Sequence, residues 1–346
     1  AFSSNAEWHT VYKDNNVYKE YDINMSSDKK EVIDCSEPQL SDRQETGTEV
    51  KFTNINTLTA ENMGFEIIEP ALLKDFAWFL YLYKNKNVEI VQSLAKWKRV
   101  ALKKYGFETG RGIYTDMNAI RKDEELDNIH SIYVDQWDWE LIIDKEERNK
   151  VKLKEIVKKI YKVFKETEEH VHEIYPEIKK ILPKEITFIT SQELLDMYPD
   201  LSPKEREDKI VRDKGAVFLM QIGKILDNGD KHDGRSPDYD DWELNGDILF
   251  YNPVLDNAIE LSSMGIRVDE ESLKYQLDVA NCNDRKELDY HKSLLNGELP
   301  YTIGGGIGQS RICMYFLNKA HIGEVQVGVC PDDMIRKCSQ SGIHLL

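Results

Sequence analysis

The chain has 346 residues, of which 40% are hydrophobic and 32% charged, and its formal net charge at pH 7 is −17. This length and composition are typical of a globular protein with a sizeable core, in one large domain or two. The negative charge argues against non-specific binding to nucleic acid, which requires lysine and arginine to neutralise phosphates. A small anionic ligand would therefore need a local cationic pocket.

The chain shows no sign of membrane insertion or export. Its most apolar stretch, Phe76–Tyr83, is far shorter than the roughly 18 to 20 residues of a membrane helix. The N-terminus lacks the basic and then apolar segments of a secretory signal. The five cysteines are odd in number and show no Cys-x-x-Cys spacing, which argues against a disulfide framework and a zinc site. We therefore expect a cytoplasmic protein with no membrane partner.

Residues 1–50 are polar and mixed in charge, without a sustained hydrophobic period. They predict an irregular N-terminal extension, and residues 51–346 predict a single domain. A short apolar strand, Val88–Val91, leads to Ser93, which can cap the helix that follows. Lysines and arginines are unusually dense on this helix, and for most of them the simplest interpretation is a helix face exposed to solvent.

The middle of the chain alternates between strand and helix patterns. Residues 112–120 predict a strand that ends in Arg121, and Ile129–Trp139 alternates apolar and polar side chains like a half-buried antiparallel strand. From Lys145 to Tyr175 apolar residues recur every three or four positions, which predicts an amphipathic helix. Pro203 predicts the start of another helix, which runs to Gly215.

The second half adds strands on either side of an acid-rich loop, 227–242, in which Asp238 and Asp241 fit loop turns as well as ligands. We expect strands at 185–189, 216–222, 247–251 and 258–268, and helices at 192–198 (capped by Ser191), 270–280 and 284–295. Strands joined by variable loops, with helices between them, predict an α+β fold built on a mainly antiparallel sheet flanked by helices.

A glycine-rich run, Ile303–Arg311, has four glycines in five positions between a strand-like and a helix-like segment. Glycines permit positive φ and close approach of other groups to the backbone. The start of the following helix would present free N–H groups to an anion, and Arg311 has the planar fork that suits phosphate. The run therefore indicates a phosphate site, although glycine turns also occur for packing alone.

Six runs together resemble the asparagine synthetase A (aspartate–ammonia ligase) family, which is built on the class II aminoacyl-tRNA synthetase core. The resemblance extends from about Val91 to Val329 and includes its motifs 2 and 3. The runs are Ser93–Arg99, Tyr133–Glu140, Ser191–Leu195, Arg235–Trp242, Glu260–Val268 and Ile303–Arg311.

The resemblance implies a two-step, ATP-dependent synthesis of L-asparagine. The side-chain carboxylate of L-aspartate attacks the α-phosphorus of ATP, which gives β-aspartyl-AMP and pyrophosphate, and ammonia then displaces AMP. On this reading Arg121 and Arg311 clamp the α-phosphate. Glu260 matches the position that holds Mg²⁺. His130 and Ser131 line the adenine or ribose pocket, and Gly306 and Gly308 form its floor.

The resemblance also implies a pocket for the aspartate zwitterion. Lys98 and Arg235 are expected to bind its carboxylates, and Lys98 is also a catalytic candidate. The remaining members of the expected pocket are Ser93, Gln136, Asp138, Asp240, Ser263 and Arg267. Of these, Gln136, Asp138 and Asp240 are candidates for the α-ammonium group. Asp138 and Arg267 fit a salt bridge that supports the sheet equally well.

The N-terminal part departs from the family pattern. Family members carry a Gly-Asp-Gly-Thr-Gln-Asp-Asn-Leu loop between a strand like Glu66–Leu72 and the helix after Ser93, and its aspartate is the usual candidate for meeting ammonium. Here that interval holds Lys74–Asn85 instead. The sequence therefore assigns no residue to ammonia.

Two other functions are weighed against the ligase. One is aspartyl- or asparaginyl-tRNA synthetase-like aminoacylation, which the acidic charge and the short motif 2 turn disfavour. The other is a non-catalytic relative that binds aspartate or nucleotide, which only the missing loop favours. The class II core usually pairs, so the resemblance also implies a homodimer.

Overall fold

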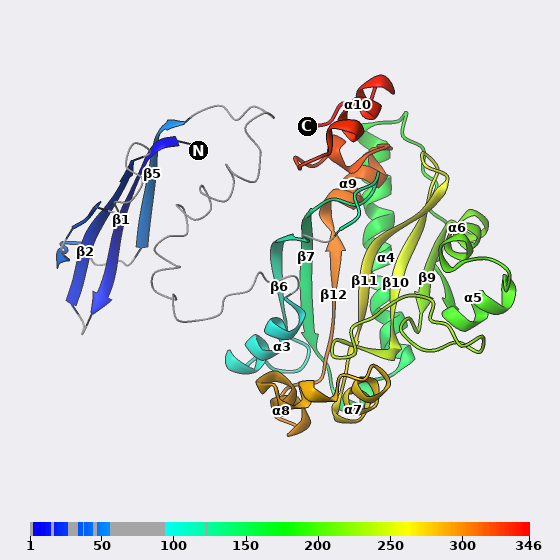
Figure 1. The fold of residues 1–346 in the computed structure, drawn as a ribbon. Coiled ribbons are helices and arrows are strands. Elements are labelled where there is room, and N and C mark those ends of the chain that lie inside the picture. Colours follow the sequence, from blue (N-terminus) through cyan, green and yellow to red (C-terminus); the bar gives the residue numbers. More distant parts are fainter. Residues whose placement is uncertain are drawn as a thin grey trace. The chain divides into compact units, whose positions relative to one another are not determined.

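Two separate sheets account for the strands of the described residues, which are 3–14, 17–26, 34–36, 38–43, 47–55, 94–121 and 124–346 of the computed structural model. The chain divides into two units, Ala1–Glu89 and Ile90–Leu346, each of which holds one sheet (Figure 1). This division lies later in the chain than residue 50, the boundary that the sequence analysis expects.

The first unit is an antiparallel sheet and not an irregular extension. Its strands are β1 (Ser3–Asp14), β2 (Val17–Ser26), β3 (Asp34–Cys35), β4 (Gln39–Leu40) and β5 (Gly47–Ile55). Strand β1 pairs with β2 and β5, and Asp14 pairs with Val17, so only two residues separate the first two strands. Aromatic and β-branched residues favour such strands even without a regular hydrophobic period, which explains why the periodicity missed them.

The second unit is built on a seven-stranded sheet with the order β6-β7-β12-β11-β10-β9-β8. Every neighbouring pair is antiparallel except β8 and β9. The strands are β6 (Gly112–Ile120), β7 (Tyr133–Ile142), β8 (Thr187–Thr190), β9 (Ala216–Met220), β10 (Asp240–Asn252), β11 (Asn257–Arg267) and β12 (Thr302–Gly308). The expected α+β fold with a mainly antiparallel sheet is confirmed.

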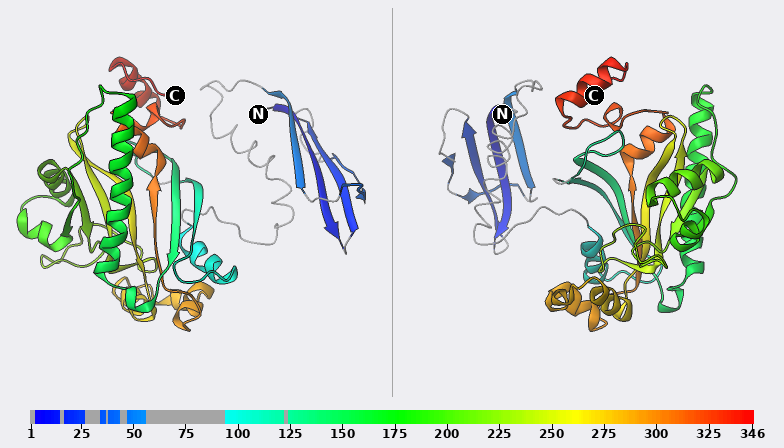
Figure 2. Two further views of the ribbon diagram at one scale, coloured as in Figure 1. Left: turned by 180° about the vertical axis from the view of Figure 1, so that it is seen from behind. Right: turned by 45° about the vertical axis from the view of Figure 1, so that its right-hand side comes forward.

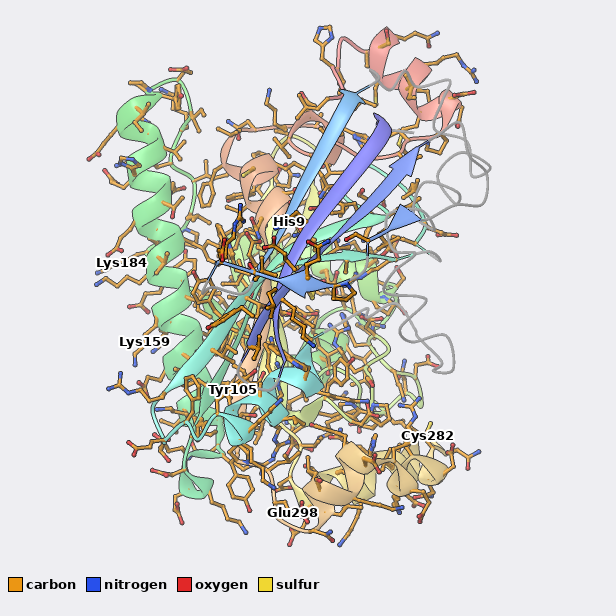
Figure 3. The ribbon with its side chains drawn as sticks, turned by 90° about the vertical axis from the view of Figure 1, so that its left-hand side faces the viewer. His9, Tyr105, Lys159, Lys184, Cys282 and Glu298 are labelled. Carbon is orange, nitrogen blue, oxygen red and sulfur yellow. The ribbon has the colours of Figure 1, made fainter. Side chains whose placement is uncertain are left out.

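Helix α4 (Lys150–Ile174) runs along one face of this sheet (Figure 2). Its apolar stripe packs Tyr161 and Phe164 edge-on against Phe250 of β10, within the main hydrophobic core. Lys159 of this helix and Lys184, in the segment between α4 and β8, are both exposed (Figure 3). This face of the sheet is therefore buried, whereas the opposite face packs a second apolar cluster under α5 (Ser191–Met197) and α6 (Pro203–Lys214) and carries polar side chains of β7 and β11.

The other helices close the ends of the sheet and its second face. They are α3 (Ala95–Lys104), α5 (Ser191–Met197), α6 (Pro203–Lys214), α7 (Glu270–Val279), α8 (Asp289–Leu295), α9 (Gln309–Phe316) and α10 (Asp332–Gln340), with 3₁₀ turns η2 (Lys145–Glu147), η3 (Asn283–Glu287) and η4 (Ile322–Glu324). Within the described ranges no helix is both long and apolar enough to cross a membrane.

The helix boundaries follow local capping chemistry. Helix α6 begins at Pro203 behind a capping box of Ser202 and Glu205 and ends before Gly215, whose φ is 75°. Helix α5 includes Ser191, because Thr190 accepts the capping hydrogen bond instead. Ser93 and the expected segments between residues 56 and 93, including the Lys74–Asn85 interval, lie outside the described residues.

Candidate active site

A cavity of about 170 Å³ opens beside β7, β11, β12 and the first turn of α9. It is bounded by the connection from β6 to β7 on one side and by η4 and the segment after it on the other. Of the residues predicted from the sequence, those that line it are Arg121, His130, Ser131, Gln136, Glu260, Gly306, Gly308 and Arg311. The same cavity is also lined by Glu124, Asp135 and Gln326, which the sequence analysis did not single out.

The glycine run forms most of strand β12 rather than a turn, and none of its glycines has positive φ. The glycines instead allow side chains of neighbouring strands to lie close to the backbone of β12. A Cβ on Gly306 would lie 2.8 Å from Gln136 Oε1 and 3.0 Å from Asp138 Oδ1, and one on Gly304 would collide with the side chains of Glu140 and Arg267. Glycine at these positions therefore leaves room above the sheet for four polar side chains.

Arg311 projects from the first turn of α9 and is held by backbone carbonyls. Its Nη1 donates to the carbonyl oxygen of Glu260 at 3.0 Å, and its Nε donates to that of Ile129 at 3.3 Å. The Glu260 carboxylate lies 3.8 Å from the same Nη1. Because the guanidinium is fixed mainly by neutral carbonyl groups, its positive charge stays available to an anionic ligand in the cavity.

The start of α9 is not free to bind an anion, contrary to the expectation from the sequence. Asp135 of β7 accepts hydrogen bonds from Ser310 N at 3.1 Å and from Ser310 Oγ at 2.5 Å. Gln326 Nε2 donates to Ser310 Oγ at 3.0 Å. A carboxylate of the chain itself therefore occupies the helix start, so that a phosphate would have to bind through the arginines.

The mouth of the cavity carries the residues around the β6–β7 connection. Arg121 follows β6 directly, and its Nη1 lies 3.5 Å from the Glu124 carboxylate. His130 Nδ1 lies 2.8 Å from Asp127 Oδ1, and that carboxylate also accepts the backbone N–H of His130. Arg121 and His130 are both partly exposed, as expected for groups that meet a ligand from solution.

Further along the same face of the sheet lies an inner polar cluster, which consists of Lys98, Asp138, Glu140, Asp240 and Arg267. Lys98 is completely buried, and its Nζ lies 3.2 Å from Asp138 Oδ1 and 3.1 Å from the carbonyl oxygen of Trp139. Arg267 binds both oxygens of Glu140 and also Asp240 Oδ1 at 2.5 Å. Both hydrogen-bond partners of Arg267 are acidic side chains of the chain itself, so its guanidinium stabilises the inner polar cluster.

Burial and charge act against each other within the inner polar cluster. Burial lowers the pKa of Lys98 below its ordinary value, although Glu140 and Asp138 act in the opposite direction. Burial by itself would raise the pKa of Glu140, but Arg267 and Lys98 hold it below its usual range. Asp138 Oδ2 is buried and makes no hydrogen bond within the described part of the chain. That oxygen is an available acceptor for a ligand cation.

Arg235 and Ser263 lie next to a buried acid, Asp247, that the sequence analysis missed. Arg235 hydrogen-bonds to Asp247 Oδ2, and Asp247 pairs with Ser263 across β10 and β11. Burial raises the pKa of Asp247 to about 8, although Arg235 acts in the opposite direction. The acid stands in an otherwise apolar strand segment, and this was the one signal that could have identified it.

Apart from Ser93, which is outside the described residues, the predicted residues therefore lie in one cavity and two adjoining clusters. Gln136 and Asp138 join the cavity to the inner polar cluster, since both side chains lie above Gly306. Glu260 lines the cavity, and its negative charge helps to raise the pKa of Arg235, so this residue joins the cavity to the second cluster. Glu140 and Asp247 complete the two clusters. Such a surface offers cations for carboxylate and phosphate groups and acceptors for an ammonium group.

The fold is that of the class II aminoacyl-tRNA synthetases. The structure is similar to asparaginyl-tRNA synthetase from Entamoeba histolytica in complex with asparaginyl-adenylate, with 12% sequence identity, a TM-score of 0.51, and coverage of 89% of this chain and 82% of that one. It is also similar to asparaginyl-tRNA synthetase from Pyrococcus horikoshii complexed with asparaginyl-adenylate, at 12% identity and a TM-score of 0.51, covering 88% and 81% of the two chains.

Sequence similarity identifies one family among the proteins that share this fold. Residues 77–342 match the family model of aspartate–ammonia ligase. The chain is 68% identical to the aspartate–ammonia ligase of Clostridium tetani over 259 residues, which is 75% of this chain and 76% of that protein. It is 62% identical to the one from Fusobacterium nucleatum over 262 residues, 76% of this chain and 80% of that protein. The chain belongs to the aspartate–ammonia ligase family, as the sequence resemblance predicted.

Proposed function

We propose that this protein joins L-aspartate and ammonia to form L-asparagine, with ATP converted to AMP and pyrophosphate through β-aspartyl-AMP. The observation that carries the proposal is the continuity of two sites in a chain of this family. A cavity with two arginines adjoins, through Gln136 and Asp138, the buried inner polar cluster, which contains two cationic side chains, Lys98 and Arg267, and a carboxylate oxygen without a hydrogen bond. Such a surface can place a carboxylate beside a phosphate.

Arg121 and Arg311 are proposed to hold ATP for the first step. An anionic carboxylate must approach an anionic α-phosphate, so positive charge has to be in place before charge accumulates in the transition state. The two arginines line the same cavity and would supply this positive charge. His130 and Ser131, on the β6–β7 side of the cavity, are proposed to contact the adenosine, above the floor formed by Gly306 and Gly308.

Mg²⁺ is proposed to bind with ATP at Glu260, and Asp247 is proposed as a second carboxylate. The two arginines face the carboxylates of Glu124, Asp135 and Glu260 in one cavity, so a triphosphate needs further positive charge. Magnesium is commonly held by one or two carboxylates together with substrate phosphates, and this donor set fits the two acids. The ion would supply charge neutralisation at the phosphates.

The inner polar cluster is proposed to bind aspartate. Asp138 Oδ2, the unpaired acceptor, and Gln136 Oε1 are the proposed partners of the α-ammonium group. Lys98 and Arg235 are the proposed partners of the carboxylates, and Ser263 lies beside Arg235 through their common neighbour Asp247. Asp240 and Arg267 are then supports rather than ligands, because Glu140 and Asp240 together accept hydrogen bonds from all three guanidinium nitrogens of Arg267.

The protein is further proposed to act as a cytoplasmic homodimer. Pairing is the usual state of the class II core, and a light-scattering mass of about twice the 40.3 kDa chain would support it. Cys282, Cys313, Cys330 and Cys338 are all unpaired, which suits a reducing compartment.

The test incubates the protein with ATP, Mg²⁺, aspartate and ammonium and follows asparagine, AMP and pyrophosphate. We expect the three products in equal amounts, and no product when the metal is removed with EDTA. Aspartate-dependent pyrophosphate exchange without ammonium would measure the first step alone. If exchange occurs but asparagine does not form, adenylation stands and the ligase function is refuted.

A further inference from the structure

The loop between β9 and β10, residues 221–239, is anchored through one completely buried acid, Asp238. Its Oδ2 accepts hydrogen bonds from three groups, Lys96 Nζ at 2.8 Å, His291 Nε2 at 2.8 Å and Arg285 Nη1 at 3.1 Å. Its Oδ1 accepts from Ser236 Oγ at 2.6 Å. Four hydrogen bonds to a single buried carboxylate exceed what a loop turn requires.

The partners of Asp238 come from separate elements. Lys96 belongs to α3, Arg285 to η3 and His291 to α8, so one side chain ties the loop to three helices. The backbone is held on both sides of Asp238 as well. Gln276 of α7 donates from Nε2 to the carbonyl oxygens of Pro237 at 2.9 Å and Asp240 at 3.0 Å.

The anchor is an ionised group. Burial by itself would raise the pKa of Asp238, but the hydrogen bonds and charges of Lys96, Ser236 and His291 hold it well below its usual range. Because a carboxylate only accepts hydrogen bonds, His291 must carry its proton on Nε2. Replacing the carboxylate with a neutral amide would weaken charge-assisted bonds to Lys96 and Arg285 together.

The anchored loop leads directly into the proposed aspartate pocket. Arg235 precedes Asp238 by three residues and binds Asp247, whereas Asp240 follows by two residues and binds Arg267. We propose that Asp238 is a positioning residue, which fixes Arg235 and Asp240 at the aspartate pocket without touching either substrate. This inference rests on the proposed ligase function. A misplacement of about 1 Å in such a pocket can reduce the rate by about 100-fold.

The test is Asp238→Asn, with aspartate and ATP varied separately in the steady state. We expect KM for aspartate to rise at least about tenfold and KM for ATP to change by less than about twofold. Hydrogen–deuterium exchange over residues 221–239 should also become faster. The matched control is Glu168→Gln, a buried acid of α4 that accepts from Lys165 and two backbone N–H groups. It should leave both KM values and exchange in the loop unchanged.

Ser236→Ala serves if Asp238→Asn does not fold, because it removes one hydrogen bond and should give a smaller change in the same direction. An unchanged KM for aspartate in the folded variant would overturn the inference, and so would an equal rise in both KM values. The proposed function fails separately, when the wild-type protein makes no asparagine. In that case loop exchange still decides whether Asp238 holds the loop, since exchange needs no turnover.

Discussion

Arg311 is the residue proposed to meet the phosphates, because backbone carbonyls fix it and the Glu260 carboxylate is as far as 3.8 Å from its Nη1. We expect Arg311→Ala to reduce aspartate-dependent pyrophosphate exchange by about 100- to 1,000-fold, since one preorganised charge contact is lost. Circular dichroism should show an intact fold. Arg336→Ala, an exposed site on α10, is the control and should keep full exchange. Near-normal exchange in Arg311→Ala would refute the phosphate role.

Gly306 lacks a side chain, and the side chains of Gln136 and Asp138 fill the space above it. In Gly306→Ala the new methyl group would meet Gln136 Oε1 at 2.8 Å and Asp138 Oδ1 at 3.0 Å, and these side chains must shift. We expect KM for aspartate to rise about tenfold or more, because the two proposed ammonium partners move. Gly234→Ala is the comparison, since its Cβ would meet nothing within 4 Å. Equal kinetics in the two variants would contradict the packing argument.

At the scale of elements, one buried ion pair joins three strands. Glu140 on β7 binds Arg267 on β11 and accepts from Thr302 Oγ1 on β12 at 2.6 Å. Glu140→Gln leaves Arg267 short of one partner, so we expect the free energy of unfolding at pH 7 to fall by about 3 to 5 kcal/mol. Urea titration measures this loss. A loss below about 1 kcal/mol would show that Asp240 alone satisfies the arginine.

The same pair predicts how this loss depends on pH. The folded-state pKa of Glu140 lies below its ordinary value of 4.5, so its contribution is present above about pH 4.5 and is lost as the pH falls below that value. The difference in stability between wild type and Glu140→Gln should therefore be constant from pH 7 to about pH 5 and shrink at lower pH. A difference that grows in acid would contradict this assignment.

For the whole molecule, charge separates the proposed ligase from the tRNA synthetases whose fold it shares. A net charge of −17 opposes binding to a polyanion, and the two arginines that line the cavity are proposed to hold ATP. We expect added tRNA to leave the rate of AMP formation unchanged at low salt, whereas ammonium should stimulate it. Retarded tRNA in a native gel, or aspartyl ester on the tRNA, would refute this prediction.

The sequence by itself determined the features that depend on neighbouring residues. The three- to four-residue period identified the amphipathic helix now seen as α4, and Pro203 and Gly215 marked both ends of α6. Alternation identified β7. These signals are local, because capping and periodicity act within one or two turns or along one strand. The six runs that resemble the family pointed correctly to its fold and membership.

Tertiary structure decided the features whose partners are far apart in the chain. Glu140 and Arg267 are 127 positions apart, and Lys96 and Asp238 are 142 apart. No local pattern shows which buried acid meets which cation. The glycine run was predicted as a strand-to-helix turn whose glycines permit positive φ and close approach, but the structure makes it a strand in which only the close approach is used. The bulk that excludes a Cβ there comes from β7 and β11, which only folding brings beside it.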